Sequence, residues 1–494
     1  MAKKLSLKNT PILIQAEQKS LAGFLSHRET KLHLLAGLVI WLVCFLLLIA
    51  TYPDPVITGD SGSYVVSSEF FHLNGFRPIG YSWLLGGING LWPSLHFTVF
   101  VHAFLYLLTG LFLLLTLRYF YSLPGGWMGW LPDAFLWLAP SVWFTHTMIM
   151  SDSFFLSLTL AYTGFLIVLI NRFSILSAVG FTLAFFLIIN TRYIGLVYLI
   201  PAIIALVFAH RWKSILILVP LVTVLVVSIQ MTETAMEERF RIRTYSEFGN
   251  WAKANNAVSV IPYIRQDSLP GILPALIPLH QFILAKPDSF YNKTSVMTTQ
   301  FIWNPAHAGK TVMDFIQKNH PIKNYTYTWL FTGKILGLYA DYLIWNHPGL
   351  FFRHYLWPNI LNVFWPGVVE GGFSNPSAQV KKIREVYGVD TRTFSVNMDW
   401  YGQLIRPIVP VVSLITWSLL IFSLIYLVKI RFQVPAHQFP WLLMLTLAGF
   451  TIIYLGGSIW GHPFHYRYQL PLHAVQLAWL VLILHVTEMQ KSIQ

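Results

Sequence analysis

Apolar runs long enough to cross a lipid bilayer recur along this sequence, with short polar segments between them. A helix that crosses a bilayer needs about 20 consecutive apolar residues, and most of the runs approach that length. The predicted spans cover residues 33–50, 97–117, 128–146, 153–170, 174–189, 193–209, 214–231, 408–428, 439–457 and 468–486. The pattern therefore predicts an all-α polytopic membrane protein with about 10 transmembrane helices.

The predicted spans form two groups, and a long, more polar segment separates them. Aromatic residues and prolines crowd the latter half of this segment, which indicates helices lying at the membrane interface. A transmembrane path for 335–357 stays open and would need a second extra span, giving up to about 12. The expected units are a cytoplasmic tail (1–32), a first transmembrane module (33–231) with an outer loop at 51–96, an outer subdomain (232–407) and a second transmembrane module (408–494).

Composition and charge agree with a membrane protein and argue against nucleic-acid binding. The chain is 55% hydrophobic and only 11% charged, and its net charge is +13. Basic residues do not run in blocks, so an excess of Lys and Arg on the cytoplasmic side explains the charge. With both termini inside, alternation places these residues in cytoplasmic positions: Arg118, Arg172, Arg211, Lys213, Lys429, Arg431 and Lys491.

Three arginines are exceptions to the excess of basic residues on the cytoplasmic side, because they map to the outer end of the bundle. Arg77, Arg192 and Arg467 come from distant parts of the sequence, yet each lies in or beside a predicted outer loop. Asp60 and Asp152 map to the same side. Charges near the hydrocarbon boundary are costly, so their convergence predicts a functional site there.

The first outer loop carries the strongest candidate chemistry. Asp60 lies in the segment Gly59-Asp-Ser-Gly-Ser-Tyr64, and Arg77 begins the segment Arg77-Pro-Ile-Gly-Tyr81, which leads into a short interfacial helix. A carboxylate here can take a proton from a hydroxyl, and an arginine can hold a phosphate with two parallel hydrogen bonds. The alternatives are a helix cap at Asp60 and an Arg77 side chain that reaches lipid headgroups.

Two later outer segments supply further candidates. Arg192 and Tyr193 occupy a very short turn between two predicted spans, and Asp152 begins a span, where it could equally serve as a helix cap. A later loop contains His462, His465 and Arg467. Two histidines three residues apart could bind a divalent metal on a helix, but the proline between them argues against a helix, so no metal ligand is assigned.

Motifs for soluble nucleotide donors are missing from the sequence. It contains no Walker-type phosphate loop, no Gly-x-Ser-x-Gly elbow and no His-Glu-x-x-His motif. An aspartate-x-aspartate pair of the kind that holds a metal and a nucleotide-sugar is also absent. A soluble nucleotide donor substrate is therefore not expected, and a donor substrate carried by a lipid is.

The charged segments of the outer loops resemble motifs of the GT-C superfamily of integral-membrane glycosyltransferases. The likeness is to the branch that includes protein O-mannosyltransferases and the lipid A aminoarabinose transferase. The matching positions are Asp60 with Tyr64, the segment Arg77 to Tyr81, Asp152 at the start of an outer-facing span, and the pattern Arg192-Tyr-Ile-Gly-Leu196. The resemblance covers the first 210 residues, and the later segment Arg467-Tyr-Gln-Leu-Pro471 also resembles the family. The departures are a single aspartate where mannosyltransferases carry an acidic pair, and an outer subdomain in the middle of the chain.

The resemblance implies a GT-C-like bundle that moves a sugar from a polyprenyl-phosphate donor to a lipid, glycan or protein acceptor. Asp60 would be the general base, and the substrate-binding residues would be Arg77, Tyr81, Asp152, Arg192, Tyr193, His465 and Arg467. No cofactor is expected, and the location would be the bacterial plasma (inner) membrane, with the active site on the outer face. The alternatives are a transporter or flippase of a lipid-linked anion, and a membrane scaffold whose outer segment binds a partner.

Overall fold

The computed structural model of the chain is helical throughout the part that it describes. This part comprises residues 20–70, 72–73, 75–264, 276–277, 280–281, 285, 308–319, 324–366, 377–389, 391, 406–430, 440–462, 464 and 466–493. Within these ranges the β-type contact is a single isolated bridge between Val56 and Met148. The prediction of an all-α protein is confirmed at this level.

Seven helical segments in the described ranges are long and apolar enough to cross a membrane. They are α2 (Arg28–Thr51), α5 (Leu95–Phe120), α8 (Ser151–Asn171), a segment over Tyr193–Phe240, α20 (Arg406–Ile430), α21 (Trp441–Gly461) and α22 (Leu472–Ile493). The shorter apolar helix α9 (Ile175–Thr191) follows α8. The prediction of a membrane protein is therefore supported, whereas the number of about ten spans stays a prediction.

The segment Tyr193–Phe240 contains two helices. Its 48 residues would measure about 72 Å if straight, more than twice the roughly 30 Å hydrocarbon core. The chain breaks at Arg211, whose φ of 51° is left-handed and ends α10 (Leu199–His210) before α11 (Ile215–Phe240) begins. These two helices correspond to the predicted spans 193–209 and 214–231.

The predicted span 128–146 does not form one helix. The structure has a short 3₁₀ turn followed by α6 (Leu131–Trp137) and α7 (Pro140–Thr147). Pro140 occupies the first turn of α7, and the preceding Ala139 is extended. Because proline lacks an N–H and excludes the residue before it from helical geometry, the helix ends and restarts there.

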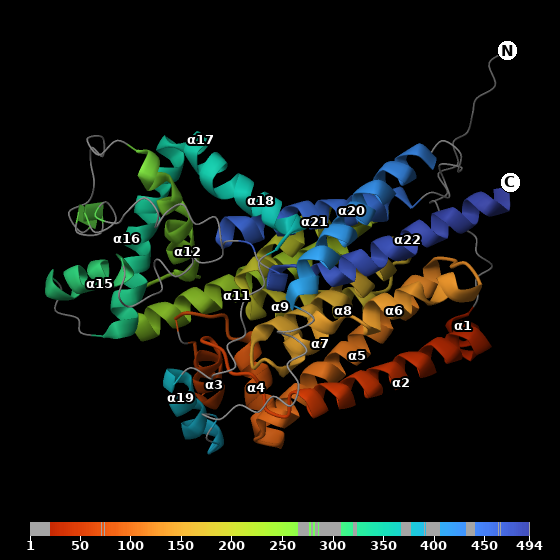
Figure 1. The fold of residues 1–494 in the computed structure, drawn as a ribbon, viewed down its shortest axis with the longest axis horizontal. Helices are drawn as coiled ribbons and strands as arrows, with labels where there is room; N and C mark the ends of the chain where they lie inside the picture. Colours follow the sequence, from red (N-terminus) through yellow and green to blue (C-terminus); the bar gives the residue numbers. More distant parts are fainter. Residues whose placement is uncertain are drawn as a thin grey trace, which may run out of the picture.

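Helix α8 lies at the centre of the bundle, between α5 and α9 (Figure 1). In its most apolar window 78% of the residues are buried, against 17% in each of α2 and α20. The apolar faces of α2 and α20 are thus free to meet lipid, as expected for outer members of a membrane bundle. Helix α1 (Leu21–Ser26) and the end of α22 lie at one end of the bundle (Figure 1).

A buried ion pair ties helices together at that end. Arg118 of α5 donates from Nη2 to Oδ2 of Asp133 in α6 at 2.5 Å, and also to the carbonyl oxygen of Gly129 at 2.6 Å. His33 of α2 places Nδ1 3.1 Å from the same carboxylate oxygen. The Asp133 carboxylate, which sequence analysis placed inside a span, therefore lies among groups from three segments of the chain.

Several described helices of the outer segment lie at the opposite end (Figure 1). Helix α12 (Phe248–Ala257) packs on α16 (Tyr325–Asn346), where the rings of Trp251 and Trp329 stack with centroids 5.2 Å apart. Helix α15 (Ala308–Asn319) lies beside α16, whereas α19 (Ser377–Tyr387) packs on α3 (Ser61–Phe70). A single helix over 335–357 is not formed, because α16 ends at Asn346, before Pro348.

Candidate active site

The two acidic candidates are placed by one backbone contact. The parallel bridge joins Val56 to Met148 through backbone hydrogen bonds of 2.9 and 3.0 Å. Asp60 follows Val56 by four residues, and Asp152 follows Met148 by the same number. Both carboxylates then stand at the start of a helix, Asp60 just before α3 (Ser61–Phe70) and Asp152 in the first turn of α8. Negative charge is favoured at these positions because helix N-termini carry partial positive charge.

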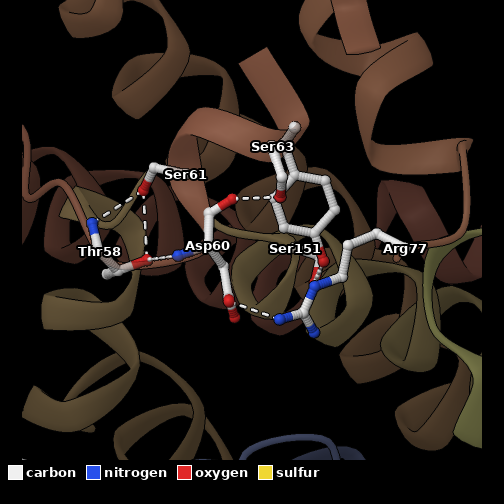
Figure 2. Close-up of polar contacts among 7 residues, drawn as sticks. Thr58, Asp60, Ser61, Ser63, Arg77 and Ser151 are labelled. Carbon is white, nitrogen blue, oxygen red and sulfur yellow. Dashed lines mark hydrogen bonds and ion pairs between the residues drawn. The ribbon is translucent and has the colours of Figure 1, made fainter. Parts of the chain in front are cut away.

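Asp60 forms an ion pair with Arg77. The Nη2 atom of Arg77 donates to Oδ1 of Asp60 at 2.5 Å, and Figure 2 shows the two side chains pointing toward one another. Their side chains are 26% and 21% exposed, so this pair lies on the open side of the site. The Arg77 guanidinium also lies over the ring of Phe248, 4.6 Å from its centroid. The predicted pairing of an acid and an arginine in this loop is thus formed.

Asp152 forms a second, more enclosed ion pair with Arg192. The Nη1 atom of Arg192 donates to Oδ1 of Asp152, while Oδ2 of that carboxylate is buried and has no hydrogen-bond partner. Their side chains are 5% and 16% exposed, respectively. Burial lowers the pKa of Arg192, but the adjacent Asp152 charge outweighs burial and raises it. Arg192 is therefore a permanently charged group inside the bundle.

A close backbone contact brings the Arg77 segment against the Arg192 turn. Helix α4 (Gly80–Leu91) begins directly after Arg77-Pro-Ile, as predicted for this apolar stretch. Any Cβ at Gly80 would lie 2.7 Å from the carbonyl oxygen of Asn190, so only glycine fits without a shift of the backbone. This contact explains why a glycine in the first outer loop matters to the position of Arg192.

Arg467 completes the group of arginines. It lies in the 3₁₀ turn Tyr466–Tyr468, with its guanidinium 5.5 Å from the ring centroid of Tyr468. Arg192 lies 5.7 Å from the same ring, so the two guanidiniums share it. The Nε of Arg467 is buried without a hydrogen-bond partner, and the described residues give it no carboxylate partner within ion-pair distance. Burial lowers its pKa, but the Asp152 charge outweighs this and raises it.

Tyr64 links the two helices at whose starts the acids lie. Its hydroxyl lies 3.1 Å from Oγ of Ser151, which connects α3 to α8. Burial raises the pKa of Tyr64, and the charges of Arg77, Asp60 and Arg192 all act on it. Its hydroxyl therefore stays protonated at neutral pH and can serve as a neutral link between charged neighbours.

Tyr81 is completely buried. Its hydroxyl lies 3.1 Å from Nε2 of His102, whose Nδ1 lies 3.1 Å from the carbonyl oxygen of His146. A carbonyl oxygen can only accept, so His102 carries its proton on Nδ1 and Tyr81 donates to Nε2. In this structure Tyr81 thus anchors α4 to α5 through a hydroxyl that is already hydrogen-bonded.

Two predicted site residues remain, Tyr193 and His465, and Tyr193 lies near the site. The ring of Tyr193 packs edge-on against Tyr245, with centroids 5.2 Å apart, and follows Arg192 directly. His465 lies outside the described residues. Three aromatic neighbours of the guanidiniums were missed by sequence reasoning, namely Phe155, Phe248 and Tyr468. Only Tyr468 carried a signal, because it adjoins Arg467 in the sequence.

The site therefore brings together five charged groups that the sequence separates by up to about 400 positions: Asp60, Arg77, Asp152, Arg192 and Arg467. Three guanidiniums face two carboxylates, which leaves one positive charge in excess. Such a cluster can bind an anion and hold a carboxylate beside it. In the described part of the chain no group of three or more His, Cys, Asp and Glu could hold a metal. No known protein family, curated protein or solved structure matches this chain.

Proposed function

We propose that this protein is an inverting glycosyltransferase of the membrane. It would move a sugar from a polyprenyl-phosphate donor to an acceptor hydroxyl on the outer face, and a bacterial inner membrane is the proposed location. The observation that carries this proposal is the excess positive charge, centred on the partly buried Arg467 side chain, for which the described part of the chain supplies no carboxylate within ion-pair distance. A phosphate monoester or diester offers the oxygen atoms that such a guanidinium binds best.

Two arginines would bind the donor. Arg192 and Arg467 flank Tyr468 and can both face one phosphate group. Their charge would stabilise the negative charge that builds on the phosphate as its bond to the sugar breaks. Because phosphate is a good leaving group in this setting, the reaction needs no separate acid.

Asp60 would be the general base. Its ion pair with Arg77 uses Oδ1, so Oδ2 can take the proton of the acceptor hydroxyl. The acceptor oxygen forms a bond to the anomeric carbon, and the bond from that carbon to the phosphate oxygen breaks with its electron pair. The proton passes to Asp60 and polyprenyl phosphate departs. A base in this position contributes on the order of 10²–10⁴-fold in rate.

The test is incubation of the purified protein with polyprenyl-phosphate sugars and a hydroxyl acceptor, with release of polyprenyl phosphate as the readout. Release that depends on Asp60, with inverted anomeric configuration in the product, supports the proposal. The competing function is transport or flipping of a lipid-linked anion. Movement of intact donor between leaflets, with no release of polyprenyl phosphate, would favour that function instead.

A further inference from the structure

The chain from Pro348 to Trp365 forms a helix with two different faces. It comprises α17 (Pro348–Phe351), a π-helical turn (Phe352–Leu356) and α18 (Trp357–Phe364). The buried face consists of Phe351, Tyr355, Asn359 and Val363. The opposite face, which we call the aromatic ridge, consists of Phe352, Trp357, Leu361 and Trp365, each about half exposed.

The π-turn is what makes the aromatic ridge continuous. The backbone N–H of Trp357 donates to the carbonyl oxygen of Phe352, five residues earlier, where an α-helix would bond four residues back. In an α-helix, residues five apart point in clearly different directions. Here the wider turn brings the ring of Phe352 beside that of Trp357, with the ring centroids 6.3 Å apart and the rings tilted by 33°.

The buried face holds the loop that carries Arg467. The hydroxyl of Tyr355 donates to the carbonyl oxygen of Ile459 at 2.7 Å. Oδ1 of Asn359 accepts the backbone N–H of Phe464 at 2.7 Å, and Nε2 of Gln469 donates to the carbonyl oxygen of Val363 at 2.5 Å. These contacts fix the loop before and after Arg467, so the position of the arginine depends on this helix.

Membrane lipid is the occupant that fits the aromatic ridge. Helix α18 packs against α20, where Oγ of Ser413 donates to the carbonyl oxygen of Val363 at 3.2 Å, so the helix that carries the ridge lies beside an apolar span. Only 17% of the apolar window of α20 is buried, as expected of a span that faces lipid. The ridge contains two tryptophans, and the exposed Arg353 adjoins it in the sequence; both residue types favour the headgroup level.

We infer that the aromatic ridge inserts into the headgroup layer of the outer leaflet and thereby positions Arg467. One face of the helix would contact the membrane, and the other would hold the anion-binding loop in place. Asn359 is then a positioning residue, because it touches the loop and not the ligand. The link to donor binding rests on the proposed function, whereas the membrane contact does not.

The membrane contact is tested by nitroxide labels on the full-length protein in bilayers. In a Cys44→Ser background, Leu361→Cys carries the label on the ridge, and Lys381→Cys is the control on an exposed face of α19. We expect the label at 361 to be relaxed by oxygen and shielded from a water-soluble nickel chelate, with the reverse at 381. Relaxation by the chelate at 361 would overturn the inference. Shielding from both reagents would point to a protein partner or second copy and would also overturn it.

The positioning role is tested by hydrogen exchange of the peptide 462–471. Asn359→Leu should raise its exchange about 10-fold and weaken binding of polyprenyl phosphate by a similar factor, since one buried hydrogen bond is lost. Asn346→Leu is the matched control, because Asn346 and Asn359 each donate to the carbonyl four residues earlier at 2.8 Å. The control should leave the peptide unchanged.

The coupling between the two faces needs a third variant. Trp357→Ser removes a ridge side chain without touching the loop, so it should raise exchange of the same peptide in bilayers by several-fold. Unchanged exchange in both Asn359→Leu and Trp357→Ser would refute the coupling. Label depth and exchange need no sugar donor, so these results stand even if no transfer activity is found.

Discussion

Replacement of Asp152 by asparagine should destabilise the protein and at the same time improve anion binding. The Asp152 side chain is only 5% exposed, and its charge acts on both Arg192 and Arg467. Removing one partner of a buried ion pair typically costs about 3–5 kcal/mol, because the other charge stays buried without compensation. We therefore expect a loss of this size for Asp152→Asn in the absence of ligand.

Binding of an anion should restore much of the stability that Asp152→Asn loses. Without Asp152, the described part of the chain gives neither Arg192 nor Arg467 a carboxylate within ion-pair distance, so a phosphate group no longer competes with Asp152 for Arg192. A ligand present at 100 times its Kd stabilises a protein by about 2.7 kcal/mol. The assay is thermal unfolding of the purified protein in detergent, over a titration of short-chain polyprenyl phosphate.

Asp133→Asn is the matched control. Asp133 is equally buried, with 2% of its side chain exposed, and pairs with Arg118 at the other end of the bundle. It should lose a similar stability and gain nothing from polyprenyl phosphate beyond the wild-type effect. Unchanged stability in Asp152→Asn, or equal recovery in both variants, would refute the reasoning about the arginine pair.

Three further results are expected. Asp60→Asn should reduce sugar transfer by at least about 10²-fold with little change in donor binding, because the loss falls on the transition state; near-normal transfer would remove Asp60 from the chemistry. Arg467→Ala should weaken donor binding, measured by calorimetry, by about 10-fold or more, and unchanged affinity would place the phosphate elsewhere. In a Cys44→Ser background, Lys381→Cys should react with an impermeant reagent on intact cells and Lys491→Cys should not; labelling at 491 would reverse the topology.

The sequence predicted the helical membrane class because span length and hydropathy are local properties. It was wrong about 128–146, since hydropathy alone treats the apolar run as continuous and gives Pro140 no weight. It also missed the wider π-turn at 352–356, because no residue type marks such a turn.

The charged candidates were predictable because charge near a membrane is rare and carries information. Which of them form ion pairs with one another was only partly predictable. Asp60 and Arg77 were expected together, but the bond from Asp152 to Arg192 depends on how α8 and α9 pack, which the sequence does not reveal. The rings of Phe155 and Phe248 resembled many other aromatic residues in a chain that is 16% aromatic, so nothing distinguished them.

The bridge between Val56 and Met148 has a consequence for mutational scanning. It consists of backbone atoms, so replacing side chains there by alanine leaves its hydrogen bonds in place. A conventional scan would therefore report the packing of the buried Val56 and Ile149 side chains and would not test the bridge itself. One inserted residue between Val56 and Asp60, however, would shift one acid relative to the other, and proline at Ile149 would delete a donor of the bridge. Evolution of this protein should thus permit exchanges among apolar residues of similar size around the bridge, and almost no change in the length of this segment.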